Sequence, residues 1–362
     1  MKADKTLKEL QVINQFDTGQ QARSVIPWGN GHINRSFLAA MESGERYILQ
    51  RINSAVFQDV DGLMDNIASV TSFLRERIQR EGGDPKRGTL TVIPSVDGRP
   101  YWKDEEGFAW RLYANVEGTV TYEKAENEEV MYQGGLAVGQ FQALLADFPV
   151  EKLHETIPDF HNTPKRYQTF EKAVSEDICG RAASVASEIA FIRERREEMS
   201  VFVEMRKKGQ LPLRVTHNDT KINNILFDEA SQRAVCLCDL DTVMPGFAAF
   251  DFGDAIRSGA NTALEDEPDS SKVSLSLPLY GAYLKGFVEG TRGRLTEEEI
   301  RMLPMGAKLM TLECGMRFLT DYLQGDTYFK IERERHNLDR CRTQLALVAD
   351  MEKKWEQMAL CV

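Results

Sequence analysis

The chain of 362 residues lacks the features that mark membrane-spanning, exported and disulfide-stabilised proteins. No stretch approaches 18 consecutive apolar residues, so we expect no membrane span. The first six residues, MKADKT, lack the apolar region of a signal peptide, which favours the cytoplasm. The six cysteines are scattered without a paired framework, and Cys236 and Cys238 have no matching second pair, so we expect inert thiols rather than a metal site.

Basic residues are also too few for one broad class of function. The 45 Lys and Arg residues are outnumbered by 56 Asp and Glu residues, which gives a formal net charge of −11. A general nucleic-acid binder needs a basic surface to displace counterions, so this balance argues against that class. Charged residues make up 28% and hydrophobic residues 42% of the chain, as in an ordinary globular enzyme, and the length is sufficient for two lobes.

One stretch carries polar residues in an order that suits phosphoryl transfer. An apolar lead-in reaches Asp219, Asn224 follows five residues later, and a second apolar run ends at Asp239. In this chemistry one carboxylate orients the attacking hydroxyl, while an amide and a second carboxylate hold Mg²⁺ on the nucleotide phosphates. Magnesium prefers oxygen ligands and keeps water and phosphate in its shell, so two protein ligands are sufficient. We therefore predict Asp219 as the catalytic base and Asn224 and Asp239 as metal ligands.

These strings resemble the aminoglycoside phosphotransferase and choline kinase superfamily, whose catalytic loop reads His-x-Asp-x-x-x-x-Asn. The likeness runs from about residue 22 to the C-terminus and is greatest to the N-acetylhexosamine 1-kinase branch. Four strings carry it: GHIN at 31–34, HNDTKINN at 217–224, DLDTVMPG at 239–246 and LECGMRFLTDY at 312–322. The resemblance implies transfer of a phosphoryl group from ATP, with Mg²⁺, to a hydroxyl group.

The resemblance also implies an α+β, two-lobed protein-kinase-like fold with a small antiparallel β lobe and a larger helical lobe. The hydrophobic pattern agrees, because helical spacing recurs over residues 4–16, 57–81, 125–146 and 303–323, whereas β-like stretches lie before residue 114. We place the nucleotide-binding lobe at residues 1–114 and the catalytic and substrate-binding lobe at residues 115–362. Residues 114–118 are the expected hinge, where adenine bonds backbone groups of Asn115 and Val116.

The phosphate contacts of the nucleotide are expected in the small lobe. Gly29 and Gly31 lie in a loop between two β-like stretches, and such a loop brings backbone N–H groups close to phosphates. Asn34 stands where a protein kinase has a third glycine. The resemblance implies that Arg51, on the strand over residues 46–52, supplies the cation for the phosphates. Its acidic partner is left open between two residues of the helix over 57–81: Asp65 and Glu76.

The acceptor site is expected where the two lobes meet. His32 and Asn34 are candidates to face the sugar or the γ-phosphate, with Asp219 at the reacting hydroxyl. The resemblance implies further sugar contacts from Arg317, on the helix over residues 303–323, and from Tyr328. Four residues near the catalytic loop are expected in supporting roles: His217 and Asp251 as braces, Lys221 as a phosphate contact, and Asp241 as a group behind the metal or a second metal ligand.

A second motif competes for the metal role. Residues 251–253 read Asp-Phe-Gly, the metal-binding string of protein kinases, but they lie 32 residues after Asp219. Asp239 lies 20 residues after Asp219 and directly follows a strand-like run. We therefore assign the metal to Asp239 and a bracing role to Asp251.

Three functions remain open at this stage. The first is an ATP- and Mg²⁺-dependent kinase for the anomeric hydroxyl of an N-acetylhexosamine or related sugar. The second is a kinase for an amino alcohol such as choline, or for an aminoglycoside, although a cationic acceptor favours carboxylates or an aromatic cage and Arg317 opposes it. The third is a non-catalytic nucleotide-binding protein, which the presence of Asp219, Asn224 and Asp239 disfavours. Fold alone does not settle the acceptor.

Overall fold

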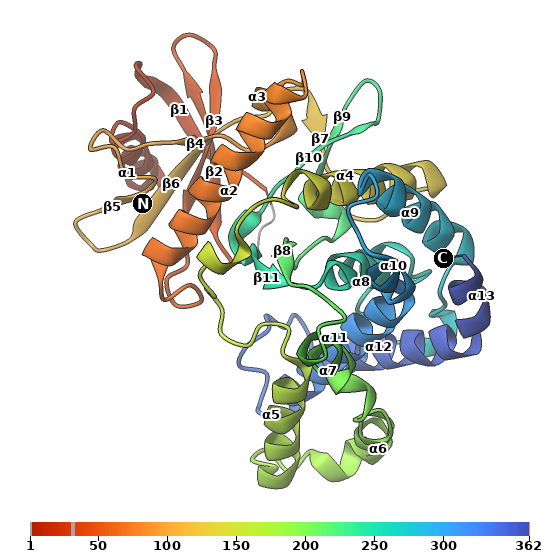
Figure 1. The fold of residues 1–362 in the computed structure, drawn as a ribbon. Coiled ribbons are helices and arrows are strands. Elements are labelled where there is room, and N and C mark those ends of the chain that lie inside the picture. Colours follow the sequence, from red (N-terminus) through yellow and green to blue (C-terminus); the bar gives the residue numbers. More distant parts are fainter. Residues whose placement is uncertain (1, 30–32, 362) are drawn as a thin grey trace.

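The computed structural model describes residues 2–29 and 33–361 and has a small and a large lobe (Figure 1). An antiparallel sheet and three flanking helices make up the small lobe, and the large lobe is mostly helical. This is the two-lobed arrangement that the sequence predicts. The last strand residue before the hinge is Ala114, and the division into lobes at that residue remains a prediction.

The small-lobe sheet has strand order β1-β2-β3-β6-β4, with β5 paired to β6, and each of these pairs is antiparallel. Its strands and the helices beside it have these bounds: α1 (Lys2–Ile13), β1 (Ala22–Pro27), β2 (Arg35–Met41), β3 (Arg46–Arg51), α2 (Val60–Arg80), α3 (Pro85–Gly88), β4 (Val92–Ile93), β5 (Trp102–Lys103) and β6 (Ala109–Ala114).

The two faces of this sheet bury different side chains because residues alternate along each strand. Leu49 pairs with Leu112, and both pack with Ile13 of α1 in a first core. Ile48 pairs with Tyr113, and this opposite face packs with α2 in the main core, which continues into the large lobe. The α2 face of the sheet is therefore the one that faces the rest of the molecule.

Helix α2 follows the predicted helix over residues 57–81 closely. The Asp59 side chain caps its first turn by accepting a hydrogen bond from the Gly62 N–H. Its buried stripe repeats every three or four residues and includes Leu63, Ile67 and Leu74. The helix ends where Gly82 takes a positive φ of 78°, a conformation that glycine adopts without strain.

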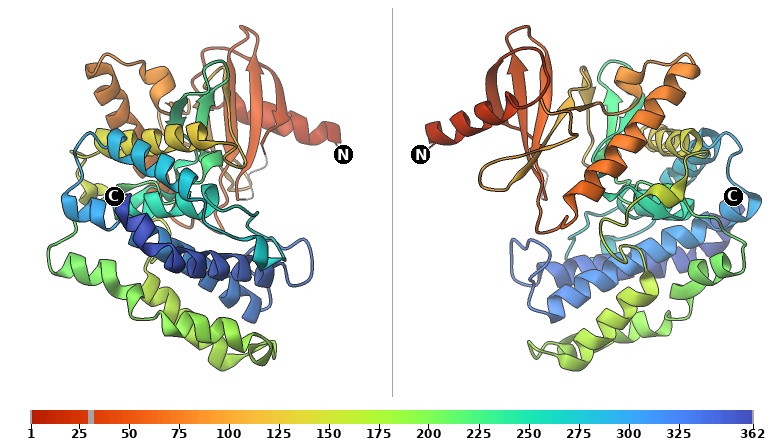
Figure 2. Two further views of the ribbon diagram at one scale, coloured as in Figure 1. Left: turned by 90° about the vertical axis from the view of Figure 1, so that its right-hand side faces the viewer. Right: turned by 60° about the vertical axis from the view of Figure 1, so that its left-hand side comes forward.

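The large lobe consists of two groups of helices and two small sheets. Helices α5 to α7 lie at the end of the molecule opposite the small lobe, and α11 runs beside α12 (Figures 1 and 2). The helices are α4 (Glu128–Leu144), α5 (Thr163–Glu176), α6 (Ala186–Glu194), α7 (Val201–Lys207), α8 (Ala248–Gly259), α9 (Leu277–Gly290), α10 (Glu297–Arg301), α11 (Leu303–Leu323), α12 (His336–Lys353) and α13 (Trp355–Leu360).

Helices α4 and α9 approach each other so closely that only glycine fits at their crossing. A Cβ added at Gly135 would lie 2.2 Å from the Tyr283 carbonyl oxygen, and one added at Gly286 would lie 2.1 Å from the Tyr132 oxygen. Gly139 and Gly290 are equally crowded by backbone of the partner helix. The glycines recur four residues apart on each helix, so they fall on one face and line the contact.

Two small sheets hold the segments that carry the catalytic residues. β7 (Thr119–Val120), just after the hinge, pairs with β9 (Ile225–Asp228), which in turn pairs with β10 (Ala234–Leu237). β8 (Arg214–Thr216) pairs with β11 (Met244–Gly246). The loops after β8 and β10 contain Asp219 and Asp239, and pairing brings both loops to one region behind the hinge.

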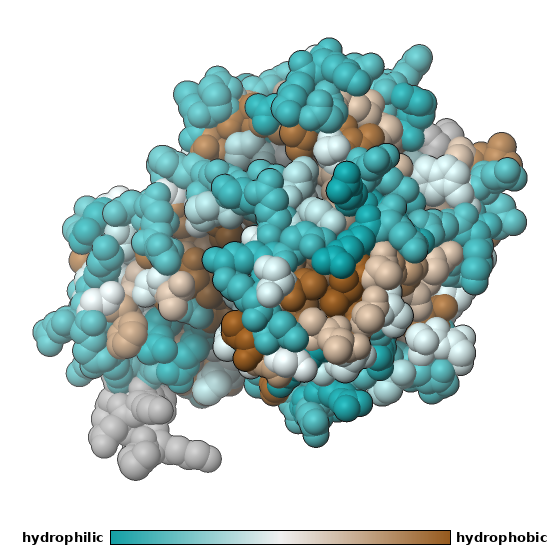
Figure 3. Space-filling view, turned by 90° about the horizontal axis from the view of Figure 1, so that it is seen from below, coloured by the Kyte–Doolittle hydropathy of each residue, from teal (hydrophilic) through white to brown (hydrophobic). Residues whose placement is uncertain are grey.

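The surface is mostly hydrophilic. Seen from below, hydrophilic residues cover most of the face, and apolar residues gather in a few places near its middle (Figure 3). All six cysteines are free, and two of them, Cys236 and Cys341, are buried. Within residues 2–29 and 33–361, no helix is both long and apolar enough to cross a membrane.

Candidate active site

The catalytic loop, residues 217–224, connects β8 to β9. Asn218 takes a left-handed φ of 63°, which turns the chain sharply after the strand. Its side-chain amide stabilises this turn by donating to the Thr242 carbonyl oxygen at 2.9 Å. The short helical turn Ile222–Asn224 then returns the chain to β9. The loop therefore presents Asp219 at its tip and Asn224 at its end.

Asp251 braces this loop from below. It lies in α8, fully buried, and one carboxylate oxygen accepts the backbone N–H of His217 at 3.0 Å while the other accepts that of Asn218 at 2.7 Å. Gln142 of α4 donates a further bond at 2.6 Å. Both oxygens of Asp251 are therefore engaged in holding the loop backbone. The Asp-Phe-Gly string that begins at Asp251 lies within the packed helix α8.

His217 holds the loop through both of its ring nitrogens. Nε2 lies 2.9 Å from the Cys238 carbonyl oxygen, and Nδ1 accepts the Asp219 backbone N–H at 3.3 Å. One nitrogen donates and the other accepts, which is the pattern of a neutral imidazole. The histidine is buried and edge-on to the Phe141 ring, so it ties the catalytic loop to the end of β10.

Both oxygens of the Asp219 carboxylate have partners within the loop. Oδ2 accepts a hydrogen bond from the Asn224 amide at 2.8 Å, and Oδ1 lies 3.2 Å from the Lys221 ammonium. Burial opposes ionisation, but the Lys221 ammonium outweighs it and lowers the pKa of Asp219 below its usual value. The side chain is 27% exposed. Asp219 is thus an oriented, ionised carboxylate that a substrate hydroxyl can reach.

Asn224 and Asp239 fit the predicted magnesium site. The Asn224 amide nitrogen donates to Asp219, which turns the amide oxygen away and leaves it available to a cation. The Asn224 carbonyl oxygen accepts the Cys238 N–H at 2.9 Å, so the backbones that carry Asn224 and Asp239 lie side by side. Across the described ranges, no three His, Cys, Asp or Glu side chains converge as a metal site.

Asp239 is crowded by negative charge. It takes a left-handed φ of 56° at the end of β10. The surrounding protein withholds water from its carboxyl group, and the charges of Asp241 and Asp219 repel a third negative charge, so the pKa of Asp239 is raised to about 7. A carboxyl group in this setting gains from a nearby divalent cation, which supports its assignment as a metal ligand.

Asp241 connects the two lobes. Its buried carboxylate forms an ion pair with Arg111 of β6 and accepts a hydrogen bond from the Asn34 side-chain amide. Asn34 also accepts the Asn53 backbone N–H at 3.0 Å. Asn34 therefore lies next to the metal-binding segment, near the predicted substrate position. Gly29, which precedes it, has a φ of 73°, whereas Gly31 and His32 lie outside the described residues.

Arg51 lies on the other side of the sheet from this ion pair. It pairs in register with Trp110, so it shares the α1 face with Leu49, and its guanidinium lies 4.3 Å from the centre of the Phe108 ring. Arg111 pairs in register with Gln50, so its side chain lies on the opposite face of the sheet. It is buried, and its Nε donates a hydrogen bond to the Gln50 side chain at 2.9 Å. The cation that faces the catalytic residues is thus Arg111.

The expectation that α2 supplies an acidic partner for the strand cation is wrong for both candidates. Asp65 lies 3.1 Å from His154, and Glu76 pairs with Arg80 one turn along the same helix. The acid that pairs with the buried arginine is instead Asp241, from the segment that follows the metal ligand. Sequence alone gave no signal for Arg111, because it stands within an apolar strand.

The hinge is held by contacts from both lobes. The Asn115 N–H donates to the Arg46 carbonyl oxygen at 3.1 Å, and the Val116 carbonyl oxygen accepts the Thr119 hydroxyl at 2.7 Å. An ion pair between Arg46 and Glu117 closes the outer side. Contact of Asn115 and Val116 with adenine stays a prediction.

Arg317 and Tyr328 lie together in the large lobe. The Arg317 guanidinium of α11 lies 5.9 Å from the ring centre of Tyr328, 5.5 Å from that of Phe160 and 5.5 Å from that of Phe329. Tyr328 is 62% exposed. The loop that carries it is fixed by Asp321, whose carboxylate accepts three consecutive backbone N–H groups.

His161 links this region to the catalytic loop. Its Nδ1 lies 2.7 Å from Glu313, one helical turn before Arg317, and its Nε2 lies 3.2 Å from the Asn218 carbonyl oxygen. The sequence places His161 in a proline-containing loop and gives it no functional role. The sequence carries no local signal for this contact, because the two partners of His161 are 152 and 57 residues away along the chain.

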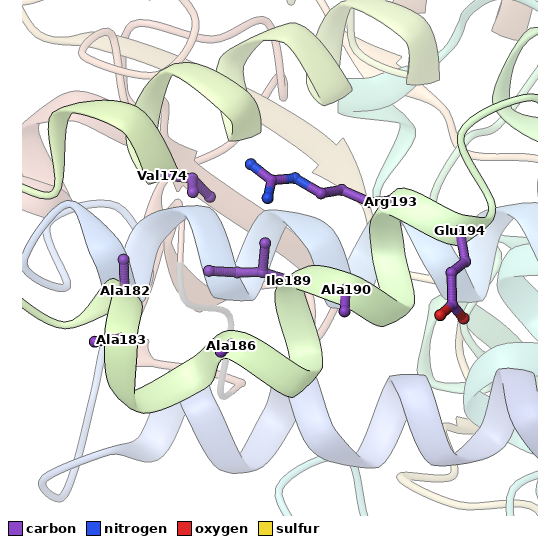
Figure 4. Close-up of a pocket in the computed structure, with 8 residues that line it drawn as sticks. All are labelled: Val174, Ala182, Ala183, Ala186, Ile189, Ala190, Arg193 and Glu194. Carbon is purple, nitrogen blue, oxygen red and sulfur yellow. The ribbon is translucent and has the colours of Figure 1, made fainter.

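A separate groove of about 400 Å³ lies far from the catalytic loop, between α5 and α6. Its lining is mostly small and apolar, with alanines from the start of α6 and the turn before it, and Arg193 and Glu194 at one end (Figure 4). It contains no group suited to phosphoryl transfer.

Comparison with known proteins agrees with this geometry. Residues 24–283 match the model of the phosphotransferase enzyme family, APH. An aminoglycoside phosphotransferase from Alicyclobacillus acidocaldarius is similar in structure, with 15% identity, 96% of each chain covered and a TM-score of 0.61.

Two further solved structures share the fold. Amicoumacin kinase, in complex with AMP-PNP, Ca²⁺ and its ligand Ami, is 15% identical, covers 96% of this chain and 92% of its own, and has a TM-score of 0.58. Choline kinase from Cryptosporidium parvum is 13% identical, with coverage of 93% and 91% and a TM-score of 0.56. The family match spans well over half of the sequence, and the chain belongs to the APH phosphotransferase enzyme family.

Proposed function

We propose that this phosphotransferase moves the γ-phosphoryl group of ATP to the anomeric hydroxyl of an N-acetylhexosamine or a related sugar. The observation that carries the proposal is the state of Asp219, an ionised and partly exposed carboxylate held between Asn224 and Lys221. Such a group accepts the hydrogen bond of an attacking hydroxyl and orients its oxygen toward phosphorus. An anomeric hydroxyl is more acidic than an ordinary alcohol, which reduces the demand on this base.

Asn224 and Asp239 would hold Mg²⁺. When bound, the ion neutralises charge on the transferred phosphates. The chain itself makes the rest of the arrangement: Asn224 orients Asp219 with its amide nitrogen, which leaves its oxygen available to the ion, and Lys221 places a positive charge beside the Asp219 carboxylate. His217 and Asp251 keep the loop backbone in place during the reaction.

The nucleotide would lie between the Gly29 loop and the hinge at Asn115 and Val116. Arg51 is the predicted phosphate contact, but its position over Phe108 on the α1 face favours Arg111 as the cation that organises this side of the cleft. Arg111 does so through its ion pair with Asp241, two residues beyond the predicted metal ligand Asp239.

The acceptor would lie between Asp219 and the cluster around Arg317. Within the described residues, Arg317 forms no ion pair, and its guanidinium faces three aromatic rings. An unpaired guanidinium can donate to sugar hydroxyl or acetamido oxygens, and an aromatic ring suits the apolar face of a sugar. The same positive charge disfavours a cationic acceptor such as choline or an aminoglycoside, which is the alternative.

An acceptor panel tests this proposal. ATP consumption with Mg²⁺ is measured against N-acetylglucosamine, N-acetylgalactosamine, glucose, galactose, choline, homoserine and kanamycin. We expect turnover with an N-acetylhexosamine and none with its methyl glycoside, in which the anomeric hydroxyl is blocked. Turnover with the amines alone would keep the phosphotransferase and overturn the sugar assignment.

A further inference from the structure

The peptide group between Asn218 and Asp219 is held at both of its polar atoms by a histidine. Its N–H donates to His217 Nδ1 at 3.3 Å, and its carbonyl oxygen lies 3.2 Å from His161 Nε2. This peptide plane determines where the Asp219 side chain begins. His217 belongs to the catalytic loop itself. His161 lies outside the loop and also contacts Glu313, so it fixes this peptide plane relative to helix α11.

The surroundings of the partly buried His161 differ from those of the two fully buried histidines, His217 and His336. His217 and His336 each accept a backbone N–H at Nδ1, from Asp219 and Glu332, and present Nε2 to an oxygen. One donor and one acceptor nitrogen suit a neutral ring. His161 instead presents Nδ1 to a carboxylate and Nε2 to a carbonyl oxygen, so both of its partners are acceptors.

We infer that His161 is a doubly protonated positioning residue that fastens the catalytic loop to the acceptor helix α11 through Glu313. Only an imidazolium donates from both nitrogens, and its charge is balanced by the Glu313 carboxylate at 2.7 Å. His161 does not touch the reacting atoms. It acts through the Asn218 carbonyl oxygen, and the inference uses the proposed phosphoryl transfer only for its kinetic readout.

The acid partner is built to remain ionised. The side chain of Glu313 is 2% exposed and that of His161 is 12% exposed. Burial opposes ionisation of Glu313, but His161 and then the Thr163 hydroxyl, which donates to its other oxygen, lower its pKa below the usual value. A Glu313 carboxylate that accepts hydrogen bonds at both oxygens matches a histidine that donates from Nδ1.

Other charges near the pair come from two elements. Arg317 lies on α11, one turn beyond Glu313, and its guanidinium is 5.5 Å from the centre of the Phe160 ring. Arg166 of α5 donates to the Phe160 carbonyl oxygen at 3.1 Å and at 3.2 Å. Both arginines oppose an imidazolium, and the rings of Phe160 and Phe250 cover His161 at 4.5 Å and 5.6 Å. The direct ion pair at 2.7 Å is shorter than these contacts and outweighs them.

The protonation state is tested directly by long-range ¹H–¹⁵N correlation on the full chain labelled at its five histidines. At neutral pH we expect one buried histidine with two protonated nitrogens, absent from the spectrum of His161→Gln, and the single-proton pattern for His217 and His336. A neutral pattern for His161 would overturn the inference whether or not the protein turns over a sugar. Glu313→Gln is expected to convert the His161 signals to the neutral pattern.

The positioning role is tested by kinetics with a matched control. His161→Gln and Glu313→Gln should each lower kcat by about 10- to 100-fold while KM for ATP changes little, because the nucleotide contacts lie elsewhere. The double variant should lose little more than either single one. The control is His154→Gln, an exposed histidine paired with Asp65, which should keep the wild-type kcat. Equal kcat in His161→Gln and His154→Gln would refute a positioning role.

A readout without turnover separates this inference from the proposed function. The amide resonances of Asn218 and Asp219 should shift in His161→Gln and stay unchanged in His154→Gln. If they shift while no acceptor on the panel is phosphorylated, the proposed function fails and the positioning contact stands. Unchanged amide resonances in His161→Gln would show that His161 does not contact the Asn218 carbonyl oxygen.

Discussion

Asp219 lies in an environment that differs from that of a surface aspartate. Asn224 and Lys221 occupy its two oxygens, and its pKa is lowered although burial acts against ionisation. A carboxylate in this state accepts a hydrogen bond but has little affinity for a proton. Its main contribution is therefore to orient the hydroxyl, with proton transfer late in the reaction.

Replacement of Asp219 by Asn keeps the shape and removes the charge. We expect turnover to fall by about 10²- to 10⁴-fold, because the amide presents a donor where the hydroxyl needs an acceptor. Binding of ATP, followed by calorimetry, should be largely retained. The control is Asp147→Asn, an exposed aspartate paired with Arg77, and near-normal turnover of Asp219→Asn would contradict the assigned role.

Asp239 predicts a pH-dependent affinity for Mg²⁺. Its pKa of about 7 is above the usual value, so the folded protein holds this proton more tightly than the unfolded chain does. In the metal-free protein, ionisation of Asp239 therefore lowers the free energy of unfolding as the pH rises toward about 7. When metal is present, the proton and Mg²⁺ compete for the Asp239 carboxylate. Mg²⁺ affinity should fall as the pH is lowered from about 8 to about 6.

Calorimetric titration of Mg²⁺ at several pH values measures this effect. Asp239→Asn removes the titrating group, so the residual binding of that variant should be weak and depend little on pH. An Mg²⁺ affinity of the wild type that is flat across the range would place the metal away from Asp239.

At the level of helices and strands, the sequence predicts most of the fold. The helices expected over residues 57–81, 125–146 and 303–323 are α2, α4 and α11, with ends that differ by at most a few residues. Their apolar residues recur at spacings of three and four in the sequence, which is a local signal. Strand β3 and the two stretches around the Gly29 loop were predictable from another local signal, the alternation of side chains along a strand.

The parts of the site that sequence did not predict depend on contacts between distant elements. Arg111 pairs with Asp241 across 130 residues, and Glu313 meets His161 across 152. Neither contact leaves a local pattern, because Arg111 sits in an apolar strand and His161 in an irregular loop. Asp219, Asn224 and Asp239 could be predicted as site residues from the sequence because the chemistry requires these residue types at short spacing on one connected segment, and their roles stay predictions.

The α4–α9 crossing offers a test of element packing. Gly135→Ala would place a Cβ 2.2 Å from the Tyr283 carbonyl oxygen, and backbone cannot easily move aside, so we expect a loss of about 1–3 kcal/mol in the free energy of unfolding. Gly281→Ala, on the partner helix α9 and with open space around it, should instead stabilise by up to about 1 kcal/mol. Equal effects in denaturant unfolding would contradict the close contact.

Across the whole molecule, the buried Arg111–Asp241 pair is the polar contact that joins the sheet to the metal-binding segment. Arg111→Met leaves the Asp241 carboxylate buried without its partner, so we expect a loss of about 3–5 kcal/mol in the free energy of unfolding. The control is Arg46→Met, which breaks the exposed pair with Glu117 and should cost no more than about 1 kcal/mol. A similar small loss in both variants would show that the buried pair contributes no more than a surface one.

The same pair relates the lobes to catalysis. Asn34 follows the Gly29 loop, and Arg111 lies on the strand that leads to the hinge, yet both contact Asp241. Asp241 therefore ties both parts of the small lobe to the segment that carries Asp239. More exposed ion pairs, such as Arg87 with Asp228 and Arg77 with Asp147, also join the lobes, whereas the Arg111–Asp241 pair is buried.

The most direct measurement is ³¹P and ¹H NMR of the product formed from Mg²⁺-ATP and N-acetylglucosamine or N-acetylgalactosamine. We expect a phosphomonoester resonance coupled to the anomeric proton, formed by the wild type and lost in Asp219→Asn. A phosphoryl group on any other oxygen, or release of inorganic phosphate with the sugar unchanged, would contradict phosphorylation of the anomeric hydroxyl by this site.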